Sequence, residues 1–455
     1  MKKLFGTDGI RAVAGQPPLD PATVHAIGLA LAHSLARTTP NPRILLGMDT
    51  RESSEGIAAT LTAGITSAGV GATVESAGII TTPAIAFLAR THGFAAGVVI
   101  SASHNPWQDN GIKLFGPDGF KLPDSTELAI EEEIFTQLKT GAPGPDSGTW
   151  ASQEAPPVNE ADRREYIQFL LAAVAGLSLD GRRIVVDCAN GAATSVAPQL
   201  FEHLGGEVII THSSPTGRNI NENCGALHPD IVAREVVAQK ASMGITFDGD
   251  ADRALFADEH GNVVNGDAVL LMAGRHLKSL GLLTNVTVVA TTMSNMGLEA
   301  ALLRSNIKML RANVGDKYVL EQMLATGAAL GGEQSGHIIF SGRSTTGDGL
   351  LTALLVLDII HRAGKPLAEL IADLKVFPQV IVNVKVREKR PLDSIPTVAA
   401  AIAAAERELD GTGRVVIRYS GTESLCRVMI EAESEPLMRQ HADHIANTIR
   451  AELGA

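Results

Sequence analysis

The sequence is short of aromatic residues, of basic residues and of long apolar runs. Aromatic side chains make up 4% of the 455 residues, which leaves few rings on which nucleobases could stack. Lys and Arg total 38 against 50 for Asp and Glu, a net charge of −12, and this disfavours a polyanion or an anionic membrane as partner. A small anionic substrate stays possible, because salt screens charges beyond about 8 Å and local cations then decide. We therefore expect no nucleic-acid partner and no membrane partner.

Membrane-spanning and targeting patterns are also missing. The most apolar stretch, residues 350–360, contains Asp358 and is much shorter than the ~20 residues of a membrane span. The opening MKKLFGTDGIR has the lysines of a signal peptide, but Asp8 and Arg11 interrupt any apolar core. The cysteines are few, widely separated and without metal-ligand spacing: Cys188, Cys224 and Cys426. These features predict a cytoplasmic protein whose thiols are free and buried.

What the sequence does contain is a repeated alternation of strand and helix patterns. Short runs rich in Val and Ile predict strands at 44–47, 97–100, 184–187, 208–211, 244–247 and 286–290. Stretches of helical period between capping or breaking residues predict helices at 21–35, 124–138, 162–175 and 349–361. This alternation is typical of βα units on a largely parallel sheet, so the predicted fold class is α/β.

Composition divides the chain into four predicted domains. A segment rich in Gly, Pro and Ser, TGAPGPDSGTWASQEAPPV at 140–158, has little to bury and predicts a linker. Further boundaries are predicted just after the DGD segment near Phe256, and near Phe377, where Pro378 precedes an apolar run. The last domain, with the runs VIVNVKV, RVVIRYS and CRVMIEAE, is predicted to be small and α+β. The predicted domains are 1–145, 158–256, 257–374 and 378–455.

The motif SASHNP, residues 101–106, follows the predicted strand GVVI. Open α/β sheets place ligands at the carboxyl ends of their strands, and Ser103 beside His104 is a candidate nucleophile with a polar partner. No GxSxG sequence surrounds Ser103, so a hydrolase triad lacks support. A Ser/Asn turn with a hydrogen-bonded histidine is the structural alternative.

The motif DGDADR, residues 248–253, follows the predicted strand GITF. Alternate residues of a looping backbone share a side, so Asp248, Asp250 and Asp252 can converge on one ion. Three carboxylates suit magnesium, which keeps its other positions for water or phosphate. A calcium EF-hand competes, because Glu259 is at the twelfth position, but Arg253 stands where that loop requires glycine. A solvated acidic loop is the remaining alternative.

Two further polar motifs are candidates for substrate binding. In GGEQSGH, residues 331–337, Glu333 and Ser335 can hydrogen-bond sugar hydroxyls, although a glycine-rich turn with an N-cap serine explains the segment better when it is taken alone. In RYSGTES, residues 418–424, backbone and hydroxyl donors can surround a phosphate, and a hairpin turn with surface arginines is the alternative. The residues proposed for that phosphate are Arg418, Ser420, Gly421, Thr422 and Arg427.

Together these segments resemble the α-D-phosphohexomutase superfamily over nearly the whole chain. The opening LFGTDGIRA and GMDTR at 47–51 look like its bacterial phosphoglucosamine mutase branch. Further matching pieces are DNGIKLF, DCANGA, NINENCGALHP, RANVGDKYV and TTGDG. The resemblance implies three related α/β domains with mixed sheets and a smaller C-terminal α+β domain around a central cleft.

The resemblance also implies roles for the candidate residues. Ser103 is then the phosphoserine, and with Asp248, Asp250 and Asp252 it holds Mg²⁺. Arg11, Lys113 and Arg253 line the reaction centre. The sugar-binding residues are Glu333, Ser335 and His337, and the substrate phosphate binds the loop that contains Ser420, Gly421 and Thr422. Lys113 or His104 moves the proton; we favour Lys113, whose pKa, about 10.4 in water, must then be lowered by cations such as Arg11.

The implied reaction is the interconversion of glucosamine 6-phosphate and glucosamine 1-phosphate, which feeds UDP-N-acetylglucosamine synthesis. The implied partners are a hexosamine phosphate and a bisphosphorylated sugar, as intermediate or activator, with the chain a monomer or homodimer. Phosphoglucomutase or phosphomannomutase activity is the nearest alternative. From other classes, a phosphate-monoester hydrolase would use the same serine and aspartates, and a calcium-binding module would use only the acidic loop.

Overall fold

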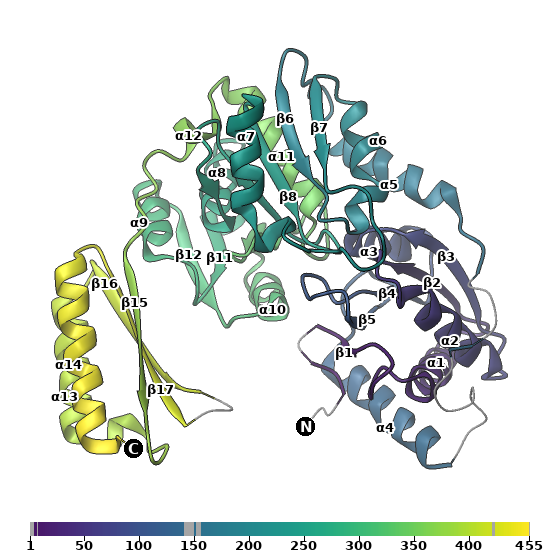
Figure 1. Cartoon of the computed structure of the whole chain (residues 1–455), viewed down its shortest axis with the longest axis horizontal. Helices are drawn as coiled ribbons and strands as arrows, with labels where there is room; N and C mark the ends of the chain where they lie inside the picture. Colours follow the sequence, from purple (N-terminus) through teal and green to yellow (C-terminus); the bar gives the residue numbers. More distant parts are fainter. Residues whose placement is uncertain (1–3, 7, 141–149, 152–155, 421–423, 455) are drawn as a thin grey trace. The chain divides into compact units, whose positions relative to one another are not determined.

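The computed structural model describes residues 4–6, 8–140, 150–151, 156–420 and 424–454 (Figure 1). Contacts divide the chain into two compact units. The larger unit comprises residues 1–293 and 309–371, and the smaller unit comprises 294–308 and 372–455. The domain boundaries derived from composition stay predictions beside this division.

The first sheet of the larger unit is mixed, with the strand order β1-β5-β4-β2-β3. The bounds are β1 Ile10–Val13, β2 Arg43–Met48, β3 Thr73–Ile79, β4 Ala96–Ile100 and β5 Asp109–Phe115. β2 pairs in parallel with β3 and β4, whereas β5 pairs antiparallel with β4 and β1. Helices α1 Pro21–Ala36, α2 Ser54–Ser67 and α4 Asp124–Thr140 share a core with one face of the sheet, and α3 Thr82–Thr91 packs on the other through Ile85.

The second sheet repeats this plan, with the order β10-β9-β8-β6-β7. The bounds are β6 Arg183–Asp187, β7 Glu207–Thr211, β8 Met243–Phe247, β9 Ala254–Ala257 and β10 Val263–Val264. β6 pairs in parallel with β7 and β8, and β9 pairs antiparallel with β8 and β10. The helices here are α5 Glu160–Ala173, α6 Ala197–Glu202 and α7 Pro229–Gln239, with 3-10 turns at Ala192–Ser195 and Gly225–Leu227.

The third sheet of the larger unit has the order β12-β11-β13-β14. The bounds are β11 Thr287–Thr291, β12 Lys308–Ala312, β13 Leu330–Gly332 and β14 Ile338–Phe340. β13 is parallel to β11 and antiparallel to β14. The helices are α8 Gly266–Ser279, α10 Asp316–Thr326, α11 Gly349–Ala363 and α12 Leu367–Leu370, with a 3-10 turn at Thr284–Val286.

The smaller unit is α+β, as predicted for the C-terminal segment. Its antiparallel sheet has the order β15-β17-β16, with β15 Gln379–Lys385, β16 Gly413–Tyr419 and β17 Leu425–Ala432. Helices α13 Pro396–Glu408 and α14 Glu435–Leu453 share its core, and Leu392–Ser394 is a 3-10 turn. Helix α9 Met296–Arg304 joins this unit because buried Glu431 accepts from the Met296 amide at 3.1 Å and from Arg414 Nε at 2.6 Å.

Local sequence signals fix the helix ends as expected. Asp20 caps α1 by accepting from the Thr23 amide at 3.1 Å, and Pro21 takes the first helical position. Asp348 caps α11 in the same way, and Gly364 ends that helix in the left-handed region. All six predicted strands and all four predicted helices lie within two residues of observed bounds. The mixed sheets implied by the resemblance are confirmed, whereas the largely parallel sheet suggested by the alternation alone was wrong, because an antiparallel hairpin follows the parallel strands in each of the first two sheets.

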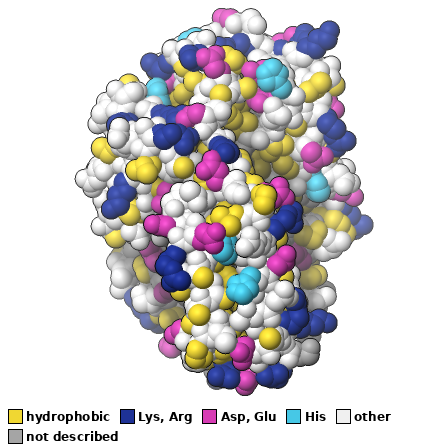
Figure 2. Space-filling model, turned by 90° about the vertical axis from the view of Figure 1, so that its left-hand side faces the viewer, with side chains coloured by type: hydrophobic (Ala, Val, Ile, Leu, Met, Phe, Trp, Pro, Cys, Tyr) yellow, Lys and Arg dark blue, Asp and Glu magenta, His cyan; other side chains and the backbone are white. Residues whose placement is uncertain are grey.

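Three observations bear on the predictions for the surface and the cellular compartment. Among the described residues, no helix is both long enough and apolar enough to cross a membrane. The three cysteines are free and buried, as predicted. On the face shown in Figure 2, Lys and Arg side chains are interspersed with Asp and Glu.

Candidate active site

Ser103 lies in the loop that leaves β4, at the carboxyl end of a buried strand. Its backbone is in the left-handed region, with φ 53°, and its side chain is buried. Ser103 Oγ donates a hydrogen bond to Asp248 Oδ2 and lies 3.3 Å from His104 Nδ1. The loop therefore presents the hydroxyl to a carboxylate of the second sheet's domain, as a nucleophile near an acidic metal site would be presented.

The three aspartates of DGDADR converge between β8 and β9. Oxygens of Asp248, Asp250 and Asp252 lie within 4.8 Å of one another, and all three side chains are buried. Among the described residues, Asp250 Oδ1 and Asp252 Oδ1 have no hydrogen-bond partner. Burial and the two neighbouring carboxylates raise the pKa of Asp248. Buried oxygens left without donors, in an all-carboxylate set, fit a hard divalent cation such as magnesium.

Lys113, on β5, reaches the same carboxylates. Its Nζ lies 2.7 Å from Asp250 Oδ2, 2.9 Å from Asp8 Oδ2 and 3.6 Å from Asp252 Oδ2. Burial alone would lower the pKa of Lys113, but these carboxylates outweigh burial and raise the pKa above its ordinary range. The lowering by neighbouring cations that we expected is therefore not what the structure has, because Arg11 is outnumbered by acids.

His104 differs from Lys113 in charge. Burial, followed by the charges of Arg253 and Arg11, lowers the pKa of His104 to about 4. The imidazole is therefore neutral near pH 7 and able to accept a proton.

A cavity of about 370 Å³ opens beside these groups. Arg11 lies on it, paired with Asp8, and its Nη1 donates to the Ala102 carbonyl at 3.3 Å. The Arg253 amide donates to Asp248 Oδ1 at 3.2 Å, and its Nε lies 3.8 Å from Asp252 Oδ1. The other predicted site residues that line the cavity are His104, Asp252, Glu333 and His337.

The GGEQSGH segment joins β13 to β14 at this cavity. Glu333 Oε1 accepts from the Gly315 amide at 3.1 Å, and Ser335 Oγ donates to Glu333 Oε2 at 3.5 Å. His337 Nε2 accepts from the Gly347 amide at 3.0 Å, so the hydrogen on Nδ1 faces Asp252 Oδ2, 3.6 Å away. A carboxylate and an imidazole of this segment thus line the cavity together with Asp252 of the acidic triplet.

The predicted phosphate loop belongs to the smaller unit. Gly421 and Thr422 lie outside the described residues. Arg418 and Arg427 are register partners on β16 and β17, and the Ser420 carbonyl accepts from Lys389 Nζ at 2.6 Å. The role of this loop stays a prediction.

Sequence reasoning did not single out several residues that complete the site. Asp8 and Asp316 are joined by the Lys121 ammonium, 2.5 Å from Asp8 Oδ1 and in contact with Asp316 Oδ2. Lys113, Lys121 and Arg11 lower the pKa of Asp8 well below its usual range, against the opposite effect of burial. Two of the three lie within matched motifs, Asp8 in GTDGIR and Asp316 in VGDKYV, which is the only signal that could have found them.

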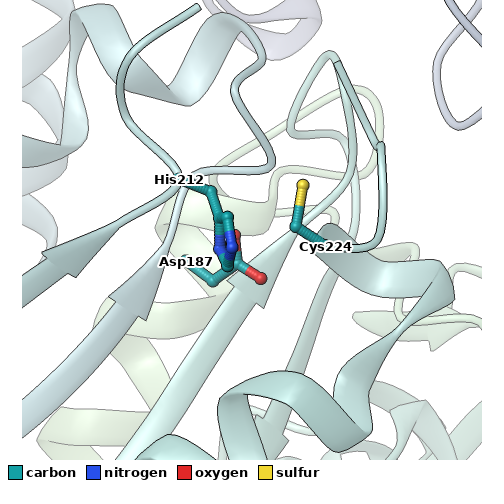
Figure 3. A group of neighbouring side chains, drawn as sticks. All are labelled: Asp187, His212 and Cys224. Carbon is teal, nitrogen blue, oxygen red and sulfur yellow. The ribbon is translucent and has the colours of Figure 1, made fainter. Parts of the chain in front are cut away.

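A second cluster with metal-ligand side chains lies at the end of β6 (Figure 3). Asp187, His212 and Cys224 meet there, with His212 Nδ1 3.1 Å from Asp187 Oδ1. Each carboxylate oxygen of Asp187 accepts two hydrogen bonds. Oδ1 accepts from the Ala189 amide and from His212, and Oδ2 accepts from the Gly225 amide and from the Thr246 hydroxyl. Burial raises the pKa of the Cys224 thiol to about 12. We interpret this cluster as a hydrogen-bond centre that fixes the loop around residue 224.

Comparison with known proteins agrees with this geometry. Four phosphoglucomutase/phosphomannomutase domain families match: alpha/beta/alpha domain I at residues 2–140, domain II at 164–261, domain III at 265–377 and the C-terminal domain at 381–448. A phosphoglucosamine mutase of Koribacter versatilis is 57% identical, over 100% of this chain and 98% of that protein. One of Solibacter usitatus is 52% identical, over 100% and 99%.

Solved structures show the same fold at lower identity. A phosphoglucomutase/phosphomannomutase family protein from Burkholderia thailandensis has a TM-score of 0.77 at 22% identity, covering 99% of this chain and 98% of its own. The N-acetylphosphoglucosamine mutase of Aspergillus fumigatus, solved with GlcNAc-6P and magnesium, has a TM-score of 0.64 at 20% identity, covering 99% and 96%. Because the similarity to the curated relatives extends over the full length, the chain belongs to the phosphoglucosamine mutase family of the α-D-phosphohexomutase superfamily.

Proposed function

We propose that the chain interconverts glucosamine 6-phosphate and glucosamine 1-phosphate through phosphorylated Ser103 and a bisphosphorylated sugar, and so feeds UDP-N-acetylglucosamine synthesis. The observation that carries the proposal is the hydrogen bond from Ser103 Oγ to Asp248, which joins a buried nucleophile to an acidic triplet beside a cavity lined by Arg11 and Arg253. The names of the full-length relatives favour glucosamine phosphates over glucose and mannose phosphates.

Two phosphoryl transfers complete the proposed reaction. In the first, the phosphorus of phosphorylated Ser103 bonds to the free hydroxyl oxygen of the bound monophosphate, and its bond to Ser103 Oγ breaks. The hydroxyl proton passes to a base. The bisphosphorylated sugar then reorients in the site. The phosphorus of its other phosphate bonds to Ser103 Oγ, the bond from that phosphorus to the sugar oxygen breaks, and the sugar oxygen takes the proton back from the base. Arg11 and Arg253 line the cavity, where their charges stabilise the transferring oxygens.

The residues that would hold magnesium are Asp248, Asp250 and Asp252 together with the oxygen of Ser103 or its phosphate. The unpartnered oxygens of Asp250 and Asp252 support this assignment, and the Aspergillus fumigatus relative was solved with magnesium. Bound there, the ion would neutralise negative charge on the transferring phosphoryl group. Because the pKa of Asp248 is raised, its carboxyl group must lose a proton before the metal site is complete. The hydrogen bond from Ser103 to Asp248 must also break.

His104 suits the proton-accepting role better than Lys113. The imidazole is neutral, lies on the cavity and has Nδ1 3.3 Å from Ser103 Oγ. Lys113 is held in its charged form by Asp250 and Asp8, so we assign it to charge balance beneath the reacting groups.

The sugar and phosphate contacts follow the family pattern. We assign Glu333, Ser335 and His337 to the sugar, since Glu333 and His337 line the cavity and Ser335 donates to Glu333. Arg418, Ser420, Gly421, Thr422 and Arg427 are assigned to the substrate phosphate. The bisphosphorylated intermediate is supported by the Aspergillus fumigatus mutase solved with glucose 1,6-bisphosphate. Free, buried thiols support a cytoplasmic location, and a monomer or homodimer stays the predicted state.

The test is the reaction of the purified chain with glucosamine 6-phosphate in the presence of magnesium and a bisphosphorylated sugar. Product and free phosphate are measured together, because isomerisation without phosphate release separates a mutase from a hydrolase. We expect Ser103→Ala to abolish turnover, whereas Ser125→Ala, at an exposed serine of α4, keeps the parent's rate. Turnover in Ser103→Ala at the parent's rate would exclude the phosphoserine route. Parallel assays with glucose and mannose phosphates measure the choice of sugar.

A further inference from the structure

The Ser103 loop has an unusual backbone that its own residues do not hold alone. Ser103 is in the left-handed region, which side chains other than glycine, asparagine and aspartate seldom adopt. Its amide donates to Ser101 Oγ at 2.9 Å, and Ser101 Oγ donates to Asp49 at 2.6 Å. These bonds fix the start of the turn. The carbonyl of Ser103 accepts its hydrogen bonds from other parts of the chain.

Arg51, which follows β2, binds the carbonyl groups of this loop with four of its five side-chain donors. The side chain is fully buried, and its Nε donates to Asp49 Oδ2 at 2.9 Å. Nη2 donates to the carbonyls of Ser103 at 2.9 Å and Asn105 at 2.8 Å. Nη1 donates to the carbonyls of Pro106 and, at 2.9 Å, Asp109. A guanidinium has five N–H donors, so this one fixes the whole turn from 103 to 109.

Asn221 binds the same carbonyls from the second sheet's domain. Its Nδ2 donates to the carbonyl of Ser103 at 2.9 Å and to that of Asn105 at 3.2 Å. The Asn221 side chain is buried, and its backbone is in the left-handed region, with φ 59°. The Asn221 amide donates to the Ala189 carbonyl at 2.9 Å, which fixes the asparagine to the domain that carries the acidic triplet.

The Asp187 cluster of Figure 3 holds the other end of this asparagine loop. Asp187 accepts from the Gly225 amide at 2.9 Å, just after Cys224. The contact across the two domains is also tight, because a Cβ at Gly249 would lie 2.3 Å from the Ser103 carbonyl oxygen. Gly249 sits between Asp248 and Asp250, so the carbonyl of the nucleophile touches the backbone of the acidic triplet itself.

We propose that Asn221, with Arg51, is a positioning residue that fixes the position of Ser103 relative to the acidic triplet. Arg51 shapes the serine loop within the first domain. Asn221 then fixes that loop to the domain of Asp248. Ser103 Oγ therefore keeps its orientation toward the carboxylates while the sugar phosphate binds and reorients. Neither residue lines the cavity, so each acts through Ser103. The inference rests on the proposed mutase reaction.

The decisive variants are Asn221→Asp, which keeps the shape and the left-handed preference but replaces the donor by an oxygen, and Asn221→Gly, which keeps the backbone and removes the amide. The matched control is Asn223→Asp, because Asn223 is also left-handed, with φ 50°, but exposed. The measurements are kcat, KM, melting temperature and the hydrogen exchange of peptides covering residues 101–112. Hydrogen exchange reports on the loop whether or not the chain turns over substrate.

We expect kcat to fall by about 10²-fold in both Asn221 variants, the scale of an ångström-level misplacement of a reacting group. KM should stay near the parent's value, amides of 101–112 should exchange faster, and Asn223→Asp should match the parent. Parent-like kcat in both variants, with Ser103→Ala inactive, would overturn the inference and leave the mutase intact. A joint fall of kcat and melting temperature, with unchanged exchange in the loop, would also overturn it. An inactive parent would instead refute the proposed function.

Discussion

Replacing Lys113 with methionine tests how the metal-free site balances its charge. The Lys113 side chain is 2% exposed, and its ammonium lies within 3 Å of Asp250 and Asp8. Methionine has a similar length and no charge, so Lys113→Met leaves the buried carboxylates without this cation. Removal of one partner from a buried ion pair typically costs about 3–5 kcal/mol of folding free energy, because the remaining charge is uncompensated.

The assay is urea unfolding in EDTA, followed by circular dichroism. With a slope of about 3 kcal/mol per molar urea, a loss of this size lowers the unfolding midpoint by about 1–2 M. The control is Lys365→Met, because Lys365 forms an exposed i,i+4 pair with Glu369, for which we expect a change of at most about 0.5 kcal/mol. Because the folded pKa of Lys113 is raised, its contribution to stability is complete below the unfolded value of 10.5 and is lost only as the pH rises from there through the folded value. The difference from the parent should therefore be constant from pH 6 to 9.

Added magnesium should restore more stability to Lys113→Met than to the parent, because the ion no longer competes with an ammonium for Asp250 and Asp252. Equal urea midpoints for variant and parent in EDTA would refute the reasoning, since Lys113 would then not be balancing the site. An equal magnesium response in both proteins would show that the ion does not use these carboxylates.

Three further outcomes are expected. Burial raises the pKa of Asp348 to about 6. The stability that this contributes is complete below pH 3.8 and is lost as the pH rises through 6. The unfolding free energy of the parent, measured with urea, should therefore fall by about 3 kcal/mol between pH 4 and 6, and Asp348→Asn should lack this fall. His104→Asn should lower kcat by about 10²-fold, as for a proton-transfer group, and the parent's pH–rate profile should contain no His104 ionisation between pH 5 and 8, because its pKa is about 4. Chelation by EDTA should abolish turnover and magnesium should restore it, whereas Asp250→Asn should weaken magnesium binding measured by calorimetry.

The sequence predicted the repeating units of the fold better than their closure into sheets. The strands β2, β4, β6 and β8 are continuous apolar runs that are buried on both faces, and this pattern is read directly from residue type. Strand β5 carries the polar residues Asp109, Asn110 and Lys113, of which Lys113 reaches the acidic triplet, so its composition did not indicate a buried strand. The antiparallel pairing that makes the sheets mixed depends on contacts between strands, which a single sequence does not specify.

Site residues were predictable where one motif contains the chemistry. The triplet of DGDADR and the serine of SASHNP show their chemistry in their side chains alone, and the structure brings Ser103 and Asp248 together. The pKa of Lys113 was not predictable, because it depends on Asp8 and Asp250, which lie 105 and 137 positions away in the chain. Asn221 and Arg51 act on backbone carbonyls, and no residue type marks a carbonyl that needs a donor.

The charges of the site explain how a chain with an acidic net charge can bind an anionic substrate. Six carboxylates and four basic side chains meet there, a formal charge of −2: Asp8, Asp248, Asp250, Asp252, Asp316 and Glu333 against Arg11, Lys113, Lys121 and Arg253. Without a metal the site resists this excess, as the raised pKa of Asp248 shows. One divalent cation would bring the formal charge to zero, and it would leave Arg11 and Arg253 on the cavity wall as cations for the transferring phosphoryl group. The basic residues needed to bind a phosphate are thus few, and the bulk composition does not reveal them.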